Sequence, residues 1–166
     1  MAIINFLLDA QPLEVTARGS HYLQDQKVDI AFITLTYPNG VLANIHISWL
    51  DPKKTRQLTV VGDRKMVTWD DTTPGAPVAI YDKGIVREPF YKDFGEFQLV
   101  TKEGDVVIPK VRAEEPLRLQ SEYFLSCVEQ GRIDRCGPEQ GLAVVRVLEA
   151  AVESMRARGA PVRIGA

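Results

Sequence analysis

A chain of 166 residues, 45% of them hydrophobic and 25% charged, has the length and composition of one globular domain with a full core. Its formal net charge of −2 gives no overall attraction for nucleic acid or an acidic membrane surface, so we expect neither as a partner. No stretch approaches the ~20 apolar residues of a membrane span, and the N-terminus has no basic, cleavable leader. We therefore expect a cytoplasmic protein.

The predicted elements begin with a short apolar helix over residues 3–8. Met1 and Ala2 supply neither a cap nor a preceding turn, which suggests that an upstream part is missing. Short segments rich in β-branched and aromatic residues follow, separated by turn signals, and they predict strands at 13–23, 29–37, 41–50, 57–62, 65–69, 78–81 and 96–102. The sequence Pro38-Asn39-Gly40 predicts a hairpin turn. Consecutive strands without helices between them predict a largely antiparallel sheet.

Two helices are predicted at the end of the chain, over residues 116–131 and 138–159. Each begins at a proline and ends at a glycine, the residues preferred at those helix positions. The expected apolar stripe of the first helix is Leu117, Phe124, Cys127 and Val128. That of the second is Leu142, Val145, Leu148, Val152 and Met155. Strands followed by helices predict an α+β domain, an open sheet with helices packed on one face.

The strand over residues 41–50 has two different faces. One face is apolar and is expected to be buried: Val41, Ala43, Ile45, Ile47 and Trp49. The other mixes apolar and hydrogen-bonding groups: Leu42, Asn44, His46, Ser48 and Leu50. Ile30, Phe32, Thr34 and Thr36 give the preceding strand a similar mixed face. Such a face suits contact with another subunit or a polar ligand, so we predict a homo-oligomer.

The search for catalytic and cofactor motifs gives mainly absences. No Gly-x-Gly occurs among the twelve glycines, which excludes the dinucleotide fingerprint and the phosphate loop. His21 and His46 lie in strand patterns without ligands at metal-binding spacing, so we expect structural or interface roles and no metal. Cys127 and Cys136 are expected to be reduced and structural, because neither has a local activating partner. We predict no catalytic and no cofactor-binding residue in this chain.

Several segments carry a family resemblance. The sequences "PLEVTARGSHYL", "DIAFITLTYPNGVLANIHISW", "SWLDPKKTRQLTVVGDRKMVTWDD" and "IYDKG" resemble the C-terminal domain of the Gfo/Idh/MocA oxidoreductases, particularly the nucleotide-sugar dehydrogenase branch. The sequences "EPLRLQSEYFLSCVEQG" and "GLAVVRVLEAAVESM" are similar to the closing helices of that family. The resemblance covers nearly the whole chain. It implies a glyceraldehyde-3-phosphate dehydrogenase-like C-terminal fold, forming a single domain over residues 1–166.

The resemblance also implies a two-domain enzyme, in which an N-terminal Rossmann domain binds NAD(P) and the C-terminal sheet supplies a substrate wall and the oligomer contact. The family's Glu-Lys-Pro motif with its catalytic lysine belongs to the other domain. Its catalytic histidine normally precedes the segment that resembles "IINFLLDAQP" and is absent here. We therefore expect a substrate-binding and oligomerisation domain that is inactive alone and pairs with a Rossmann-domain partner. The alternative is a free-standing, non-enzymatic oligomeric interaction protein.

The candidate substrate-binding residues are Trp49, Lys53, Lys54 and Arg56. In one interpretation the aromatic rings pack, and the turn charges form weak surface ion pairs of about 0–1 kcal/mol each. In a second, the basic side chains bind the diphosphate or carboxylate of a sugar nucleotide while a tryptophan stacks on a ring. A third assigns the charges to salt bridges between subunits. The same choice applies to Tyr81, Asp82 and Lys83, for which a structural role is favoured.

Overall fold

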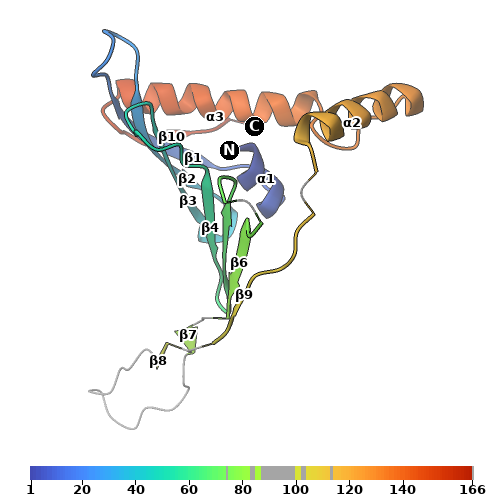
Figure 1. The fold of residues 1–166 in the computed structure, drawn as a ribbon. Helices are drawn as coiled ribbons and strands as arrows, with labels where there is room; N and C mark the ends of the chain where they lie inside the picture. Colours follow the sequence, from blue (N-terminus) through green and yellow to red (C-terminus); the bar gives the residue numbers. More distant parts are fainter. Residues whose placement is uncertain (74, 83–84, 87–99, 102–103, 113, 166) are drawn as a thin grey trace. The chain divides into compact units, whose positions relative to one another are not determined.

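The computed structural model describes residues 1–73, 75–82, 85–86, 100–101, 104–112 and 114–165 (Figure 1). The chain divides into two compact units. Unit 1 combines Met1–Asp51 with Ser121–Ala166, and unit 2 is Pro52–Gln120. Unit 2 is therefore inserted into the sequence of unit 1. All strand pairs in the described residues are antiparallel, which confirms the predicted α+β fold with an antiparallel sheet.

Unit 1 contains a four-stranded sheet in the order β10-β1-β2-β3. Its strands are β1 (Glu14–Ser20), β2 (Ile30–Thr36), β3 (Leu42–Ser48) and β10 (Val162–Arg163). The predicted hairpin joins β2 to β3 through a 3-10 turn at Pro38–Gly40. Asn39 and Gly40 have φ values of 61° and 75°, a region that glycine and asparagine enter readily. The backbone N–H of Tyr37 closes the turn by donating to the carbonyl oxygen of Val41 at 2.8 Å.

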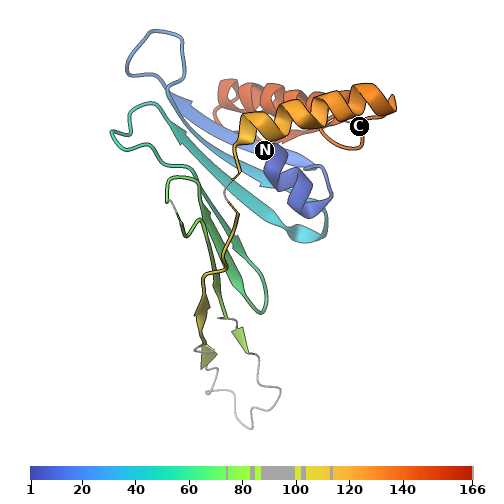
Figure 2. The same ribbon diagram turned by 45° about the vertical axis from the view of Figure 1, so that its right-hand side comes forward.

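Helix α3 (Pro138–Arg156) covers one face of this sheet and contacts β1 and β10 (Figure 2). Its buried residues are small and recur at helical spacing: Ala143, Val147, Ala150, Ala151 and Ser154. They pack against alternate residues of β1 and β2, namely Val15, Ala17, Ala31, Ile33 and Leu35. The small side chains let the helix approach the sheet closely. At Gly19 the approach is so close that a Cβ would lie 2.7 Å from the Sδ of Met155.

Ser154 is fully buried and connects three segments. Its Oγ accepts a hydrogen bond from the backbone N–H of Ala17 in β1 at 2.8 Å, and donates to the carbonyl oxygen of Ala160 at 2.7 Å. Strand β10 pairs with β1 only at Glu14 and Val15. Ser154 therefore satisfies a backbone donor of β1 just beyond the short β10 strand.

Helix α1 (Ala2–Leu8) is held to the sheet through Asn5. The buried Tyr37 donates its hydroxyl hydrogen bond to the Oδ1 of Asn5 at 2.6 Å, and Ile4 packs against the core cluster. Helix α2 (Pro116–Gln130) begins in unit 2 and ends in unit 1. The hydroxyl of Tyr123 in α2 accepts hydrogen bonds from the backbone N–H groups of Asp134 and Arg135, which fixes the turn towards α3.

Unit 2 contains a second four-stranded sheet in the order β4-β5-β6-β9. Its strands are β4 (Gln57–Val61), β5 (Met66–Asp70), β6 (Val78–Tyr81) and β9 (Val106–Val107). Two short strands, β7 (Ile85–Val86) and β8 (Val100–Thr101), form a separate pair. Most of the strand predicted over residues 96–102 lies outside the described residues. None of the helices among the described residues is long and apolar enough to cross a membrane.

The predicted apolar stripe of α3 is wrong for four of its five residues. Leu142, Val145, Leu148 and Val152 are between 41% and 52% exposed, whereas Met155 packs against the core. Alanine-rich residues occupy the sheet-facing side instead, so the larger side chains of α3 face outwards. The predicted stripe of α2 is also mainly uncovered: Leu117, Phe124 and Val128 are exposed.

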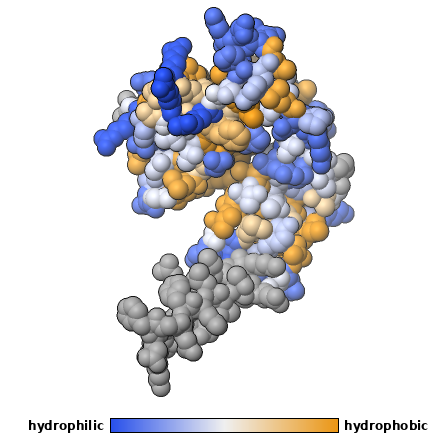
Figure 3. Space-filling model, turned by 90° about the vertical axis from the view of Figure 1, so that its left-hand side faces the viewer, coloured by the Kyte–Doolittle hydropathy of each residue, from blue (hydrophilic) through white to orange (hydrophobic). Residues whose placement is uncertain are grey.

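The predicted burial of one face of residues 41–50 holds only in the middle of the strand. Ala43 and Ile45 pack against the core, but Val41, Ile47 and Trp49 are exposed. These three side chains are exposed because β3 is the edge strand of its sheet, whereas α3 contacts β1 and β10 at the opposite edge. Figure 3 shows apolar patches open at the surface between hydrophilic ones.

Candidate functional site

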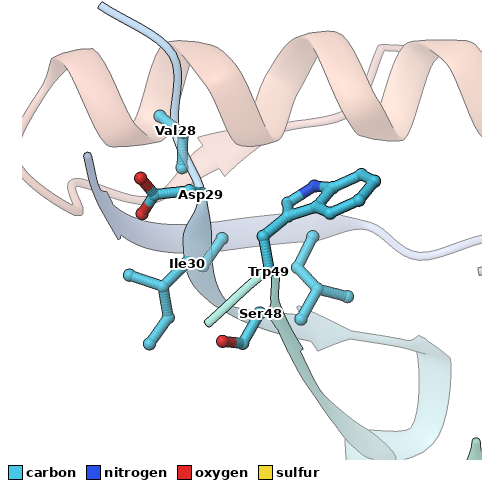
Figure 4. A pocket seen from close by; sticks show the side chains of 7 residues that line it. Val28, Asp29, Ile30, Ser48 and Trp49 are labelled. Carbon is cyan, nitrogen blue, oxygen red and sulfur yellow. The ribbon is translucent and has the colours of Figure 1, made fainter. Parts of the chain in front are cut away.

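Trp49 follows β3 directly and is 84% exposed. Its backbone N–H donates to the carbonyl oxygen of Asp29 at 2.8 Å, which extends the β2–β3 ladder by one step. A small cavity of about 120 Å³ lies beside it (Figure 4), lined by Val28, Asp29, Ile30, Ala31, Ile47, Ser48 and Trp49. The backbone of Trp49 is thus fixed while its indole remains available. An exposed indole offers a flat apolar face for stacking on a planar or sugar ring.

Asp29 is the buried carboxylate of this region and was not found by sequence reasoning. It is 7% exposed, and its Oδ2 accepts hydrogen bonds from the backbone N–H groups of Tyr22 and Leu23, each at 2.7 Å. These two bonds, that from Tyr22 first, lower the pKa of Asp29 below its ordinary value, with burial opposing them. Figure 4 shows its carboxylate turned away from the Trp49 ring. Asp29 therefore holds the loop between β1 and β2 through these two hydrogen bonds.

Lys53, Lys54 and Arg56 lie in unit 2, before β4, and all three are exposed. Arg56 makes an ion pair with the Oδ2 of Asp71 at 3.3 Å, and its carbonyl oxygen accepts a hydrogen bond from the Asp71 backbone N–H at 3.0 Å. Within the described part of the chain, Lys53 and Lys54 form no ion pair. The two lysines are therefore free to bind an anion, whereas Arg56 already has a carboxylate partner.

The acidic residues of the same segment have structural partners. The Oδ1 of Asp70 accepts hydrogen bonds from the backbone N–H and the hydroxyl of Thr72, and its Oδ2 accepts one from the Gln57 amide. These bonds, led by that from the Thr72 side chain, hold the pKa of Asp70 far below its ordinary value. Trp69 is half-buried in β5 opposite Leu58. The packing interpretation fits Trp69, Asp70 and Arg56, but it does not account for Trp49 or the two lysines.

The outer face of the unit 1 sheet is a second candidate surface, defined by Phe32, Thr34, Leu42, Asn44 and His46. The rings of Phe32 and His46 stack at 4.6 Å with an angle of 8° between their planes. The amide of Asn44 donates to the Oγ1 of Thr34 at 3.3 Å. Phe32 and Leu42 are exposed, so the face presents apolar area alongside the Asn44–Thr34 pair.

The remaining candidates give no catalytic arrangement. Tyr81 is half-buried in β6, the backbone of Asp82 donates to the carbonyl oxygen of Asp105, and Lys83 lies outside the described residues. Cys127 and Cys136 are free thiols. Among the residues that the structure describes, no group of three or more His, Cys, Asp or Glu side chains could hold a metal ion.

A comparison with protein families gives a match over nearly the whole chain. The model of the Gfo/Idh/MocA family, described as "Oxidoreductase family, C-terminal alpha/beta domain", matches residues 1–164. No curated protein matches the chain.

Similar solved structures include three dehydrogenases or oxidoreductases of different organisms. An aldose-aldose oxidoreductase from Caulobacter crescentus is 21% identical with a TM-score of 0.71, over 98% of this chain and 44% of that one. A UDP-N-acetylglucosamine 3-dehydrogenase, GnnA, from Acidithiobacillus ferrooxidans is 25% identical with a TM-score of 0.63, and the match covers 94% of this chain and 45% of that one. The WlbA dehydrogenase from Bordetella pertussis, solved with NADH and UDP-GlcNAcA, is 14% identical with a TM-score of 0.66, and the match covers 99% of this chain and 42% of that one. The chain thus spans less than half the length of these relatives.

Proposed function

Because the chain belongs to the Gfo/Idh/MocA oxidoreductase family, as its C-terminal α/β domain, we propose that it is the substrate-binding and oligomerisation domain of an NAD(P)-dependent sugar or nucleotide-sugar dehydrogenase. In this proposal both units form one functional domain. Hydride transfer requires a Rossmann-domain partner that binds NAD(P). The chain alone has no catalytic role, since its residues offer no phosphate-binding glycine turn.

The observation that carries the proposal is an exposed Trp49 followed, four and five residues later, by Lys53 and Lys54, which form no ion pair with the residues that the structure describes. An indole that projects into solvent has lost the hydrophobic stabilisation that burial would give it, so a ligand surface is a good reason for its exposure. Ammonium groups attract phosphate oxygens as point charges. Ring stacking together with phosphate attraction is the combination that a nucleoside diphosphate sugar requires. The GnnA relative is named for such a substrate.

We assign the oligomer contact to the outer sheet face. This face combines the exposed apolar side chains of Phe32 and Leu42 with polar groups of Asn44 and His46, which could pair with groups of a second copy. A two-fold axis would place the same patch of each copy against the other. Light scattering should therefore give a dimer or larger oligomer at tens of micromolar, and Phe32→Lys should shift it towards monomer. A wild-type monomer under these conditions would contradict this assignment.

The ligand proposal can be tested by titrating the chain with UDP-N-acetylglucosamine. In a Trp69→Phe background the remaining fluorescence comes from Trp49 alone, so a saturable change reports a ligand at this side chain. Binding is expected to be weak, because one domain supplies only part of the buried surface of a small-molecule site. It should also weaken as salt is added, because the lysines act by charge.

A matched pair of variants separates the lysines from general charge. Lys53→Ala with Lys54→Ala should weaken binding. Arg64→Ala with Lys65→Ala removes the same charge from the exposed turn between β4 and β5, and should leave binding unchanged. Equal effects of the two pairs, or no saturable Trp49 signal at low salt, would refute the proposed site.

A further inference from the structure

The cavity beside Trp49, which we call the Trp49 recess, lies at the uncovered edge of the unit 1 sheet. Side chains alternate along a strand, so Ile47 and Trp49 continue the face through which Ala43 and Ile45 pack against the core. Helix α3 contacts β1 and β10 at the opposite edge, so it leaves this end of β3 open. Figure 4 shows the Trp49 ring on one side of the strands and the Ser48 hydroxyl on the other.

The Trp49 recess is mainly apolar and has the size of one small ring. Val28, Ala31, Ile47 and Trp49 contribute apolar side chains to its lining, and its volume is about 120 Å³. An engineered apolar cavity of about 150 Å³ in another protein takes up benzene, so this recess admits one six-membered ring but not the two fused rings of a purine. Val28 and Ile47 are 47% and 55% exposed, so a ring that enters covers apolar surface that is otherwise wet.

The backbone of Ser48 gives the recess a polar rim. In an antiparallel ladder the N–H and C=O groups of successive residues point alternately towards the neighbouring strand and away from it. The N–H of Trp49 donates across the ladder to the carbonyl oxygen of Asp29 at 2.8 Å, so the N–H and C=O of Ser48 point to the free edge of β3. In the described part of the chain no strand pairs with that edge. One donor and one acceptor therefore lie side by side next to the indole.

We propose that the Trp49 recess and the Ser48 backbone together bind the pyrimidine base of the nucleotide sugar; this inference rests on the proposed function. Proteins hold single bases by stacking them on aromatic side chains and by hydrogen bonds to their Watson–Crick edge. That edge of uracil carries the N3–H donor beside a carbonyl acceptor, which matches the C=O and N–H of one strand residue. The sugar ring then stays outside the recess, and the diphosphate is the group that Lys53 and Lys54 attract.

Fragments of the ligand test which ring occupies the recess. In the Trp69→Phe protein, uridine should change the Trp49 fluorescence saturably, with a dissociation constant on the order of millimolar because only the base is held. N-acetylglucosamine should have no effect, and adenosine should bind much more weakly than uridine because its base has two rings. Uridine is uncharged, so its binding should not depend on salt. A signal from N-acetylglucosamine without one from uridine, or equal binding of adenosine and uridine, would overturn the inference.

A modified nucleoside tests the contact with the Ser48 backbone. 3-Methyluridine has the same ring as uridine but lacks the N3–H donor. It should bind about fivefold more weakly or worse, because the carbonyl oxygen of Ser48 is left without its partner and the methyl group is in its place. Equal binding of the two nucleosides would overturn the proposed recognition of the base.

Two variants that carry the same new charge test the location of the site. Ile47→Glu places a hydrated carboxylate in the Trp49 recess and should weaken uridine binding by about tenfold. Val41→Glu places the same group on an exposed apolar residue just before β3, at the far end of the strand, and should leave binding unchanged. Both residues are exposed, so both variants should keep the unfolding midpoint of the parent protein. Equal uridine affinities of the two variants would overturn the site.

The proposed function and the base site fail in different ways. A lack of any saturable Trp49 signal from UDP-N-acetylglucosamine at low salt refutes the proposed function, and uridine is then measured independently. A signal from UDP-N-acetylglucosamine with none from uridine refutes the base site alone, because the nucleotide sugar then contacts Trp49 through another of its groups.

Discussion

Replacing Ser154 with alanine removes one hydroxyl, which leaves the buried N–H of Ala17 and the part-buried carbonyl of Ala160 without this partner. The N–H of Ala17 loses its acceptor at 2.8 Å, and the carbonyl of Ala160 loses its donor at 2.7 Å. Strand β10 cannot replace the first bond, because its pairing with β1 is confined to Glu14 and Val15. No water can take over without entering a core in which Ser154 has no exposed surface.

The expected decrease in the free energy of unfolding follows from these two backbone groups. A buried polar group left unsatisfied costs about 1–3 kcal/mol, and the carbonyl end is closer to the surface, so the sum is about 2–4 kcal/mol. Ser126→Ala is a matched control in α2. Its hydroxyl donates to the carbonyl of Tyr123 in its own helix, and its loss should change stability by less than about 0.5 kcal/mol.

Urea unfolding followed by circular dichroism at 222 nm measures this difference, since helices α1 and α3 both belong to unit 1. Hydrogen exchange gives a local check. The amide of Ala17 should exchange much faster in the Ser154→Ala protein, while amides of the central β2 strand keep more of their protection. The reasoning is refuted if Ser154→Ala and Ser126→Ala are equally stable, or if exchange at Ala17 is unchanged.

Three further changes test other parts of unit 1. The backbone bonds to Asp29 depress its pKa in the fold, so its ionised form stabilises the protein above the ordinary carboxyl value of about 4, and this stabilisation is lost as the pH falls through the lowered pKa. Asp29→Asn should therefore be less stable than the wild type at neutral pH, and its urea midpoint should fall less steeply as the pH is lowered from 7 to 2. A curve of midpoint against pH that runs parallel to that of the wild type would contradict this. Tyr37→Phe removes the 2.6 Å bond to Asn5 and should cost about 0.5–1.5 kcal/mol in urea unfolding, with no loss counting against the anchoring of α1. Gly19→Ala places a methyl group 2.7 Å from the sulfur of Met155 and should cost about 1–3 kcal/mol, partly recovered in the double variant with Met155→Ala; a lack of recovery would show that this contact is not the cause.

Local patterns in the sequence predicted most of the elements. The alternation in β2 and β3, with Pro38-Asn39-Gly40 between them, specified both strands and their turn, because turn chemistry and side-chain period act over a few residues. The prolines at positions 116 and 138 marked the starts of α2 and α3 correctly for the same reason. The family resemblance predicted the family that the comparison later confirmed.

Features that depend on contacts between distant residues were not predictable in this way. Both sides of α3 are apolar, and a pattern that ranks leucine and valine above alanine selected the wrong side. Packing against the sheet determines which side of α3 is buried, because the alanine-rich side lets the helix approach the sheet more closely. The exposure of Trp49 follows from the edge position of β3, which strand order sets and local sequence does not.

The candidate site was predicted in part for similar reasons. Sequence identified Trp49, Lys53, Lys54 and Arg56, but it could not separate the free lysines from the paired arginine, since Asp71 lies fifteen residues further along. Asp29 was taken as the first residue of the strand predicted over residues 29–37, because the two backbone groups that bind its carboxylate come together with it only in the folded loop.

The insertion of unit 2 within unit 1 has a consequence for synthesis on the ribosome. Strands β1 to β3 are complete by Ser48, yet the helix that covers them and the edge strand that pairs with β1 begin only at Pro138 and Val162. The hydrogen bond from Ala17 to Ser154 spans 137 residues. During translation the apolar face of these strands stays uncovered until unit 2 and then α3 have been synthesised, so native packing in unit 1 follows the synthesis of unit 2. Chaperone binding to nascent chains should accordingly concentrate on the segment from Val15 to Leu35 and end when α3 emerges.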